Sequence, residues 1–197
     1  MSSISPDSKK LLILDLDETL VFTAKNESSL RDSADFKVKD HLGNIKFYGK
    51  KRSGLDAFLT FAFKHFDVAL WSSSGEDYLS SVTKSIFQRE QPIFTWGRGR
   101  CTRRFYHEMQ KECFLKKLSK IFRKKVYRKE HVLIIDNSPD KCQLNYGNYI
   151  RCHSFLGEKN DRELFKLQSY LSSIKDEKNW RSIEKRFWRD EINDCEF

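Results

Sequence analysis

Two aspartates two residues apart, Asp15 and Asp17, follow an uninterrupted aliphatic run near the start of the chain, and Thr19 comes two residues later. A run of four or five aliphatic residues bounded by polar ones predicts a buried strand. Carboxylates at the end of such a strand are costly to bury unless a cation or hydrogen-bond donors meet them. Because open α/β sheets bind ligands beyond the carboxyl ends of their strands, this pair lies where chemistry is expected.

Three other interpretations compete for the same residues. Asp17 or Thr19 can simply cap a helix. An EF-hand loop starting at Asp15 needs Gly at its sixth position and Glu at its twelfth; the chain has Leu20 and Asn26 there, which excludes calcium binding of this kind. A dinucleotide site is excluded because no Gly-x-Gly-x-x-Gly follows the strand. Motifs elsewhere in the chain are therefore needed to distinguish a catalytic site from a simple helix cap.

Further polar signals follow later in the chain. Ser72, Ser73, Ser74 and Gly75 follow an apolar stretch at 66–71, and Asp136 and Asn137 end another at 132–136. Lys116 stands between them, within Phe-Leu-Lys-Lys-Leu. Since strand ends of a parallel sheet share one edge, we expect a single crevice to collect these groups.

With these signals in order, the chain resembles the haloacid dehalogenase superfamily. The resemblance is to its phosphatases of the RNA polymerase II C-terminal domain, the small, NLI-interacting-factor-like branch. The resemblance covers roughly residues 9–175, and the matching stretches within it are residues 14–20, 34–36, 51–52, 114–119 and 135–139. The family usually has threonine where Ser72 stands, so a hydroxyl is kept, and its usual proline after Lys-Arg is Ser53 here.

The resemblance implies a phosphomonoesterase, and the residue types suit that chemistry. A carboxylate nucleophile, Asp15, splits phosphoester hydrolysis into two easier steps through an aspartyl phosphate, while Asp17 serves as acid and then as base. Mg²⁺ is the expected cofactor, held by the Asp15 carboxylate, the Asp17 main-chain carbonyl and Asn137, because it prefers oxygen ligands. The phosphoryl oxygens are expected on Ser72, Ser73 and Lys116, with Thr19 and Asp136 as orienting groups.

The remaining patterns predict an α/β fold, a doubly wound parallel sheet in one domain over 1–197. Additional strands are expected at 93–96 and 149–153, and helices at 54–65, 77–87 and 113–122. Residues 34–50 predict an inserted β-hairpin, and 161–194 a C-terminal appendage of two helices.

No large cap domain is expected, so the open site favours a phosphorylated protein or peptide over a metabolite. Phosphoserine, phosphothreonine and phosphotyrosine all remain open; Trp71, the hairpin and residues 96–105 are candidates to line a deeper aromatic pocket for phosphotyrosine.

Composition narrows the protein class. The net charge of +9 favours an acidic, phosphorylated or nucleic-acid partner. No signal peptide or transmembrane segment is expected, and five scattered cysteines without Cys-x-x-Cys indicate a reducing compartment, cytoplasm or nucleus, with delivery into a host cell equally compatible. None of the cysteines has an arginine six residues later, which excludes cysteine-based phosphatases.

The alternative function is nucleic-acid binding, or a phosphatase acting on nucleic-acid ends, because 97–104 and 116–129 are basic with interleaved aromatics. A non-catalytic binding scaffold is the third hypothesis. The oligomeric state is open.

Overall fold

The centre of the fold is a five-stranded parallel sheet. The computed structural model describes residues 9–25 and 28–192 of the 197. The strand order is β10-β9-β1-β5-β6, with bounds Tyr149–Arg151, Val132–Asp136, Leu11–Leu14, Asp67–Trp71 and Thr95–Trp96. The central strand β1 is Leu-Leu-Ile-Leu and fully buried, as a strand covered on both faces must be.

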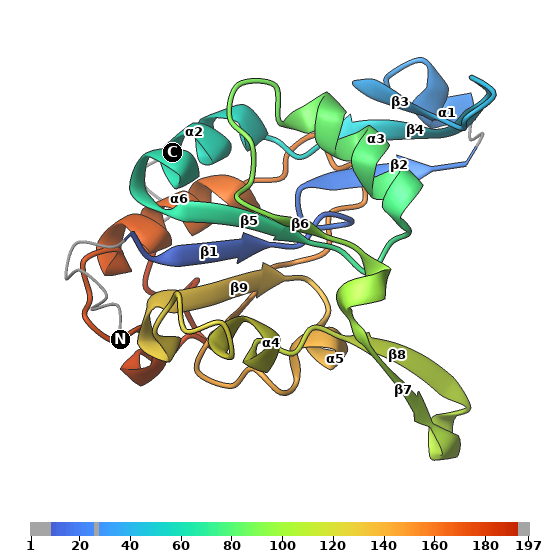
Figure 1. Cartoon of the computed structure of the whole chain (residues 1–197). Coiled ribbons are helices and arrows are strands. Elements are labelled where there is room, and N and C mark those ends of the chain that lie inside the picture. Colours follow the sequence, from blue (N-terminus) through green and yellow to red (C-terminus); the bar gives the residue numbers. More distant parts are fainter. Residues whose placement is uncertain (1–8, 26–27, 193–197) are drawn as a thin grey trace.

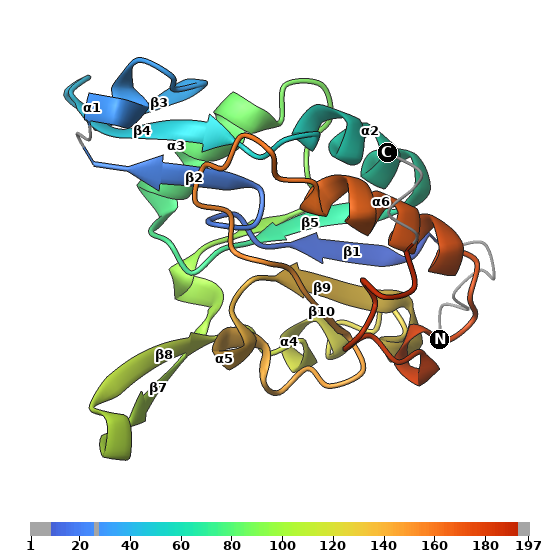
Figure 2. The same ribbon diagram turned by 180° about the vertical axis from the view of Figure 1, so that it is seen from behind.

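Helices cover both faces of this sheet (Figures 1 and 2). On one face lie α2 (Leu55–His65), α3 (Glu76–Ile86) and α6 (Glu163–Ile174), and on the other the short helices α4 (Ser119–Phe122) and α5 (Pro139–Cys142). Strand alternation divides the core: Leu12 and Leu14 pack on the first face, Leu11 and Ile13 on the second. The predicted doubly wound α/β fold is therefore confirmed.

A second, antiparallel sheet lies beside the carboxyl ends of the main strands (Figure 2). Its order is β2-β4-β3, with bounds Val21–Ala24, Ile45–Lys51 and Phe36–Lys39, and the short helix α1 (Ser28–Arg31) follows β2. The predicted hairpin at 34–50 is confirmed, and β2 extends it to three strands. The insertion is small and leaves the strand ends without a large cap.

The predicted helix at 113–122 is wrong. Residues Lys111–Leu115 form strand β8, which pairs antiparallel with β7 (Thr102–Tyr106), and only Ser119–Phe122 is helical. Cys113 and Leu115 are buried with the period of two that a strand gives, whereas Leu118 and Ile121 belong to the α4 contact with the sheet. Short 3₁₀ turns flank the hairpin at Arg98–Arg100 and join its strands at His107–Met109.

The second predicted C-terminal helix is also wrong. After α6 the chain makes a 3₁₀ turn at Trp180–Ser182 and continues without a regular helix to residue 192. Trp180 and Trp188 are nevertheless fully buried, and their indole N–H groups donate to the carbonyls of Ile174 and Arg151. The spacing of these apolar residues thus reflects their burial in the core and does not indicate a helix. Another 3₁₀ turn, Lys129–His131, leads into β9.

Candidate active site

The register of the central strands brings two predicted carboxylates together. Leu14 of β1 pairs with Ile135 of β9, and the Asp15 amide donates to the Ile135 carbonyl at 2.9 Å. Asp15 and Asp136 are therefore neighbours at the same sheet edge, and their side chains are almost completely buried. Two like charges in so dry a place require a positive charge between them.

Lys116 supplies that charge. Its ammonium donates to Asp15 Oδ1 at 2.5 Å and to Asp136 Oδ2 at 2.6 Å, and the side chain is fully buried. Burial by itself lowers the Lys116 pKa, but Asp136 and Asp15 outweigh it and hold the pKa above its ordinary value, so the lysine stays charged. The group of three carries one net negative charge in a water-poor site, an arrangement that attracts a further cation.

The position of Lys116 is fixed by its backbone rather than by a helix. Its amide donates to the Lys141 carbonyl at 2.9 Å, and Asn145 receives the Leu118 amide and donates to the Lys116 carbonyl at 2.6 Å. Asn145 is itself buried. No sequence pattern pointed to Asn145, because the Lys116 carbonyl that it contacts lies almost thirty positions away.

Asp136 has further contacts that hold its carboxylate. The Ser138 amide donates to Asp136 Oδ1 at 2.8 Å, and the Cys142 thiol lies 3.6 Å from Oδ2. Burial and the nearby Asp136 raise the Cys142 pKa well above its usual range, so the thiol stays neutral. Burial and Asp15 raise the Asp136 pKa against the opposing effect of Lys116.

Thr19 and Asp17 come from the turn that follows β1. Thr19 is buried, and its hydroxyl donates to Asp15 Oδ2 at 3.3 Å. Asp17 forms an isolated bridge with Val21 that uses the Leu16 carbonyl and the Glu18 amide, and so does not engage the Asp17 carbonyl. Glu18 adopts a left-handed conformation with φ 59°, which is uncommon for a residue with a side chain.

Three hydroxyl groups converge on the Asp17 carboxylate. Ser72 and Ser74 donate to Oδ2 at 3.2 and 2.7 Å, and Tyr78 donates to Oδ1. Burial and the proximity of Asp17 raise the Tyr78 pKa, so the phenol remains a donor. Ser72 was predicted as a phosphate ligand and lies in this place. Ser74 was expected in the same crevice but without a role, and Tyr78, the third residue of α3, was missed.

The remaining predicted residues lie around this centre. The Ser73 carbonyl accepts from Arg98 Nε at 2.7 Å, and its half-buried side chain follows β5. The Asn137 amide nitrogen donates to Glu18 at 2.9 Å and to Ser154 at 3.0 Å, which leaves its oxygen on the opposite side of the amide.

The donor set suits Mg²⁺. The predicted ligands are the Asp15 carboxylate, the Asp17 main-chain carbonyl and the Asn137 amide oxygen, all hard oxygen groups of the kind that Mg²⁺ takes together with waters and phosphate. Within residues 9–25 and 28–192, no three His, Cys, Asp or Glu side chains gather into an all-side-chain metal cluster. The excess negative charge of Asp15, Lys116 and Asp136 favours a cation at this edge.

Arg52 is a buried residue whose role the sequence did not reveal. Its guanidinium donates to both Asp161 oxygens at 2.7 Å, to the Thr19 carbonyl at 3.1 Å and to the His153 carbonyl at 2.8 Å. The side chain is completely buried, and its ring neighbour is Phe155. Arg52 thus joins the turn that carries Thr19 to the chain after β10.

Trp71 does not line a pocket. It is fully buried in the core beneath the sheet, with its ring edge-to-face against Trp96 at 4.9 Å. The expectation that Trp71 deepens a phosphotyrosine pocket is therefore wrong: the residue ends a strand that is covered on both faces, so its ring is enclosed.

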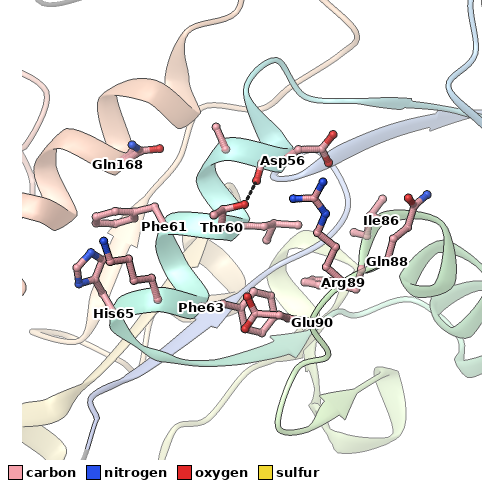
Figure 3. Close-up of a pocket in the computed structure, with 14 residues that line it drawn as sticks. Asp56, Thr60, Phe61, Phe63, His65, Ile86, Gln88, Arg89, Glu90 and Gln168 are labelled. Atoms are coloured by element: carbon pink, nitrogen blue, oxygen red, sulfur yellow. Dashed lines mark hydrogen bonds between the residues drawn. The ribbon is translucent and has the colours of Figure 1, made fainter.

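A separate hollow of about 690 Å³ lies between α2 and the segment after α3 (Figure 3). Phe61, Phe63 and His65 contribute from α2, and Arg89 and Glu90 from the opposite wall. None of its lining residues belongs to the predicted site. The buried charges of Asp15, Lys116 and Asp136 lie at the strand ends instead, where the site is predicted.

The fold and the grouping of charge are those expected from the resemblance to phosphatases of the haloacid dehalogenase superfamily. The model of the NLI interacting factor-like phosphatase family matches residues 10–181, and the chain belongs to this family. The prediction of the family and of a phosphatase is thereby confirmed.

Curated relatives agree. Nuclear envelope morphology protein 1 of Saccharomyces cerevisiae is 27% identical over 92% of this chain and 43% of its own length, so the chain spans less than half of that protein. CTD nuclear envelope phosphatase 1 of Xenopus tropicalis is 28% identical over 93% of this chain and 74% of the relative. The solved structure of fission yeast RNA polymerase II CTD phosphatase Fcp1 has a TM-score of 0.66 at 14% identity, covering 85% of this chain and 62% of that one, and shows the shared fold.

Two further findings bear on the protein class. Among the described residues, no helix is both long and apolar enough to cross a membrane. Cys101, Cys113, Cys142 and Cys152 are free thiols, and Cys195 lies outside the described residues.

Proposed function

We propose that the chain hydrolyses phosphomonoesters of proteins through a phosphorylated Asp15, with Mg²⁺ as cofactor. The observation that carries the proposal is the buried group of Asp15, Lys116 and Asp136 at the meeting of two parallel strand ends. An ion pair of this kind is costly to maintain for stability alone, since apolar replacements of buried ion pairs are often neutral or stabilising. Catalysis gives a reason for its presence.

The proposed reaction has two displacements. An Asp15 carboxylate oxygen attacks phosphorus, the bond from phosphorus to the ester oxygen breaks, and Asp17 gives its proton to the departing alcohol. Asp17 then removes a proton from water as the water oxygen attacks phosphorus, which releases inorganic phosphate and restores Asp15. When bound, Mg²⁺ neutralises charge on the phosphoryl oxygens.

The protein groups around the aspartates would hold the phosphoryl oxygens. Lys116 brings a fixed positive charge, and Ser72 and Ser73 bring hydroxyl and amide donors at the end of β5. Thr19 and Asp136 would keep Asp15 and Lys116 in place through their hydrogen bonds. Asn137 and the Asp17 carbonyl would complete the protein ligands of the metal.

The test is p-nitrophenyl phosphate hydrolysis by the wild type and by Asp15→Asn, with Mg²⁺ and after removal of metal with EDTA. The proposal expects activity only for the wild type with Mg²⁺, restored when Mg²⁺ is added back. Lys117→Met, which changes a neighbouring half-buried lysine, is the matched control and should stay active. Turnover by Asp15→Asn at the wild-type rate would refute the nucleophile.

The substrate side chain is the second element of the proposal. Phosphoserine, phosphothreonine and phosphotyrosine are all compatible with an open site, and relative rates on matched peptides decide among them. The names of the relatives, which refer to the nuclear envelope, support a location in the nucleus or cytoplasm. The alternative, binding of nucleic acid or dephosphorylation of its ends, rests on the basic segment 97–129 and is tested by salt-sensitive binding of an unphosphorylated oligonucleotide.

A further inference from the structure

The positive charge of the chain is concentrated in one segment. Residues 97–129 contain thirteen lysines and arginines against two glutamates, a net charge of +11, so the other 164 residues together carry −2. Within this segment the β7–β8 hairpin, residues 102–115, projects from the body of the domain in both views (Figures 1 and 2). We call this hairpin the arm.

Both ends of the arm are attached at the catalytic edge. Its second strand ends at Leu115 and leads directly into Lys116. Its first strand follows a turn in which the Arg98 amide donates to the Ser74 carbonyl at 2.9 Å and the Arg98 guanidinium to the Ser73 carbonyl at 2.7 Å. A molecule lying along the arm therefore reaches residues 72–74, the predicted phosphate loop after β5.

The two faces of the arm differ. Arg104 and Tyr106 share a face with Lys111 and the buried Cys113. This face contacts α5 and the residue after it through the Lys111–Asp140 ion pair and the Tyr106–Gln143 hydrogen bond. The strand register places Arg103 and Phe105 on the other face, together with Glu112 and Phe114.

The second face forms a continuous strip with Arg98. The Arg98 guanidinium lies over the Phe114 ring, 5.0 Å from its centre, and Arg103 follows toward the tip, beside Phe105. The Arg103 side chain is 76% exposed, and it forms a surface ion pair with the half-buried Glu112 that a stronger acidic ligand can displace. We name Arg98, Arg103, Phe105 and Phe114 the arm strip.

We infer that the arm strip binds an acidic segment that flanks the phosphorylated residue of a protein substrate. The inference rests on the proposed function and names its substrate class. Charge complementarity carries it, because the strip presents two guanidinium groups in line with the phosphate loop. A cation or imidazole ring already packs on both aromatics, Arg98 on Phe114 and His107 on Phe105 at 4.9 Å, which favours carboxylates and phosphates over stacked bases.

The experiment compares two phosphopeptides with the same phosphoresidue, one with Asp and Glu on both sides and one with Asn and Gln at those positions. At low salt the wild type should hydrolyse the acidic peptide with a kcat/KM about 10-fold higher. Arg103→Glu should lose most of that preference, whereas Arg104→Glu, the same charge change on the opposite face, should keep most of it. p-Nitrophenyl phosphate, which cannot reach the strip, reports folding and chemistry in all three proteins.

The outcomes separate the two proposals. No hydrolysis of p-nitrophenyl phosphate by the wild type contradicts the proposed function itself. With that activity present, the absence of any preference for the acidic peptide, or equal losses for Arg103→Glu and Arg104→Glu, overturns the strip. Tighter binding of an unphosphorylated oligonucleotide than of the acidic peptide, lost in Arg103→Glu, would also overturn it by making the strip a nucleic-acid surface.

Discussion

Replacing Lys116 by methionine tests the electrostatic account of the site most directly. Methionine keeps much of the length and the apolar stem but removes the ammonium group, so Asp15 and Asp136 remain buried beside each other without a positive charge. Breaking a buried pair by removal of one partner costs about 3–5 kcal/mol. This is a large part of the 5–15 kcal/mol that typically stabilises a domain, and we expect the melting temperature to fall by about 10 °C.

The loss should depend on pH in a defined direction. Burial and Asp15 already raise the Asp136 pKa, and Lys116 opposes them, so its removal raises the pKa further. A carboxyl group whose pKa is higher in the folded state than in the unfolded chain makes folding take up protons. Its destabilising effect is absent below the ordinary carboxyl pKa and grows as the pH rises through the raised value. The variant should therefore recover stability relative to the wild type between pH 7.5 and pH 5.

Urea unfolding of both proteins at pH 7.5 and pH 5, without metal, measures these differences. Lys117→Met serves as the control, because it removes a neighbouring half-buried ammonium and should cost less than about 1 kcal/mol. A Lys116→Met variant as stable as the wild type at pH 7.5, or with the same deficit at both pH values, would refute the reasoning.

Substitutions at three further positions are informative. Asp17→Asn should lower kcat on a phosphoserine peptide by about 10²–10⁴-fold and on p-nitrophenyl phosphate by less, because nitrophenolate leaves without a proton; equal losses contradict the acid role. Tyr78→Phe should lower the free energy of unfolding by about 1–2 kcal/mol and alter kcat rather than KM, since its hydroxyl contacts Asp17; a change in KM alone contradicts this. Arg52→Met should cost about 3–5 kcal/mol in urea unfolding by leaving Asp161 and two carbonyls unpaired. Arg52→Lys should recover less than half of it, because one ammonium cannot replace the planar fork.

The central strands and the long helices were predictable because their environment leaves a local signal. Strands β1 and β9 are enclosed on both faces and are aliphatic runs; Asp15 directly follows β1, and Asp136 ends β9. α2 and α3 bury one face each, which gives the helical spacing of Leu55, Phe58 and Leu59. Parallel pairing then places the acids side by side without further information.

The arm and the support of the site could not be predicted in the same way. Strand β7 carries Arg103 and Arg104 on opposite faces and is mostly exposed, so apolar alternation is missing. The contacts of Tyr78 with Asp17 and of Asn145 with the chain around Lys116 join residues far apart in the sequence. Such contacts depend on how elements pack, and no single stretch of sequence encodes them.

The left-handed Glu18, which directly follows Asp17, has a consequence for heat resistance. A residue with a side chain pays about 1 kcal/mol or more for this conformation, and the surrounding contacts hold it there. Glycine adopts the same angles without that penalty, but Glu18→Gly would also give up the bond to Asn137. The stability of Glu18→Gly therefore shows whether the relief of strain outweighs the loss of that hydrogen bond, and thermal unfolding of the variant measures it.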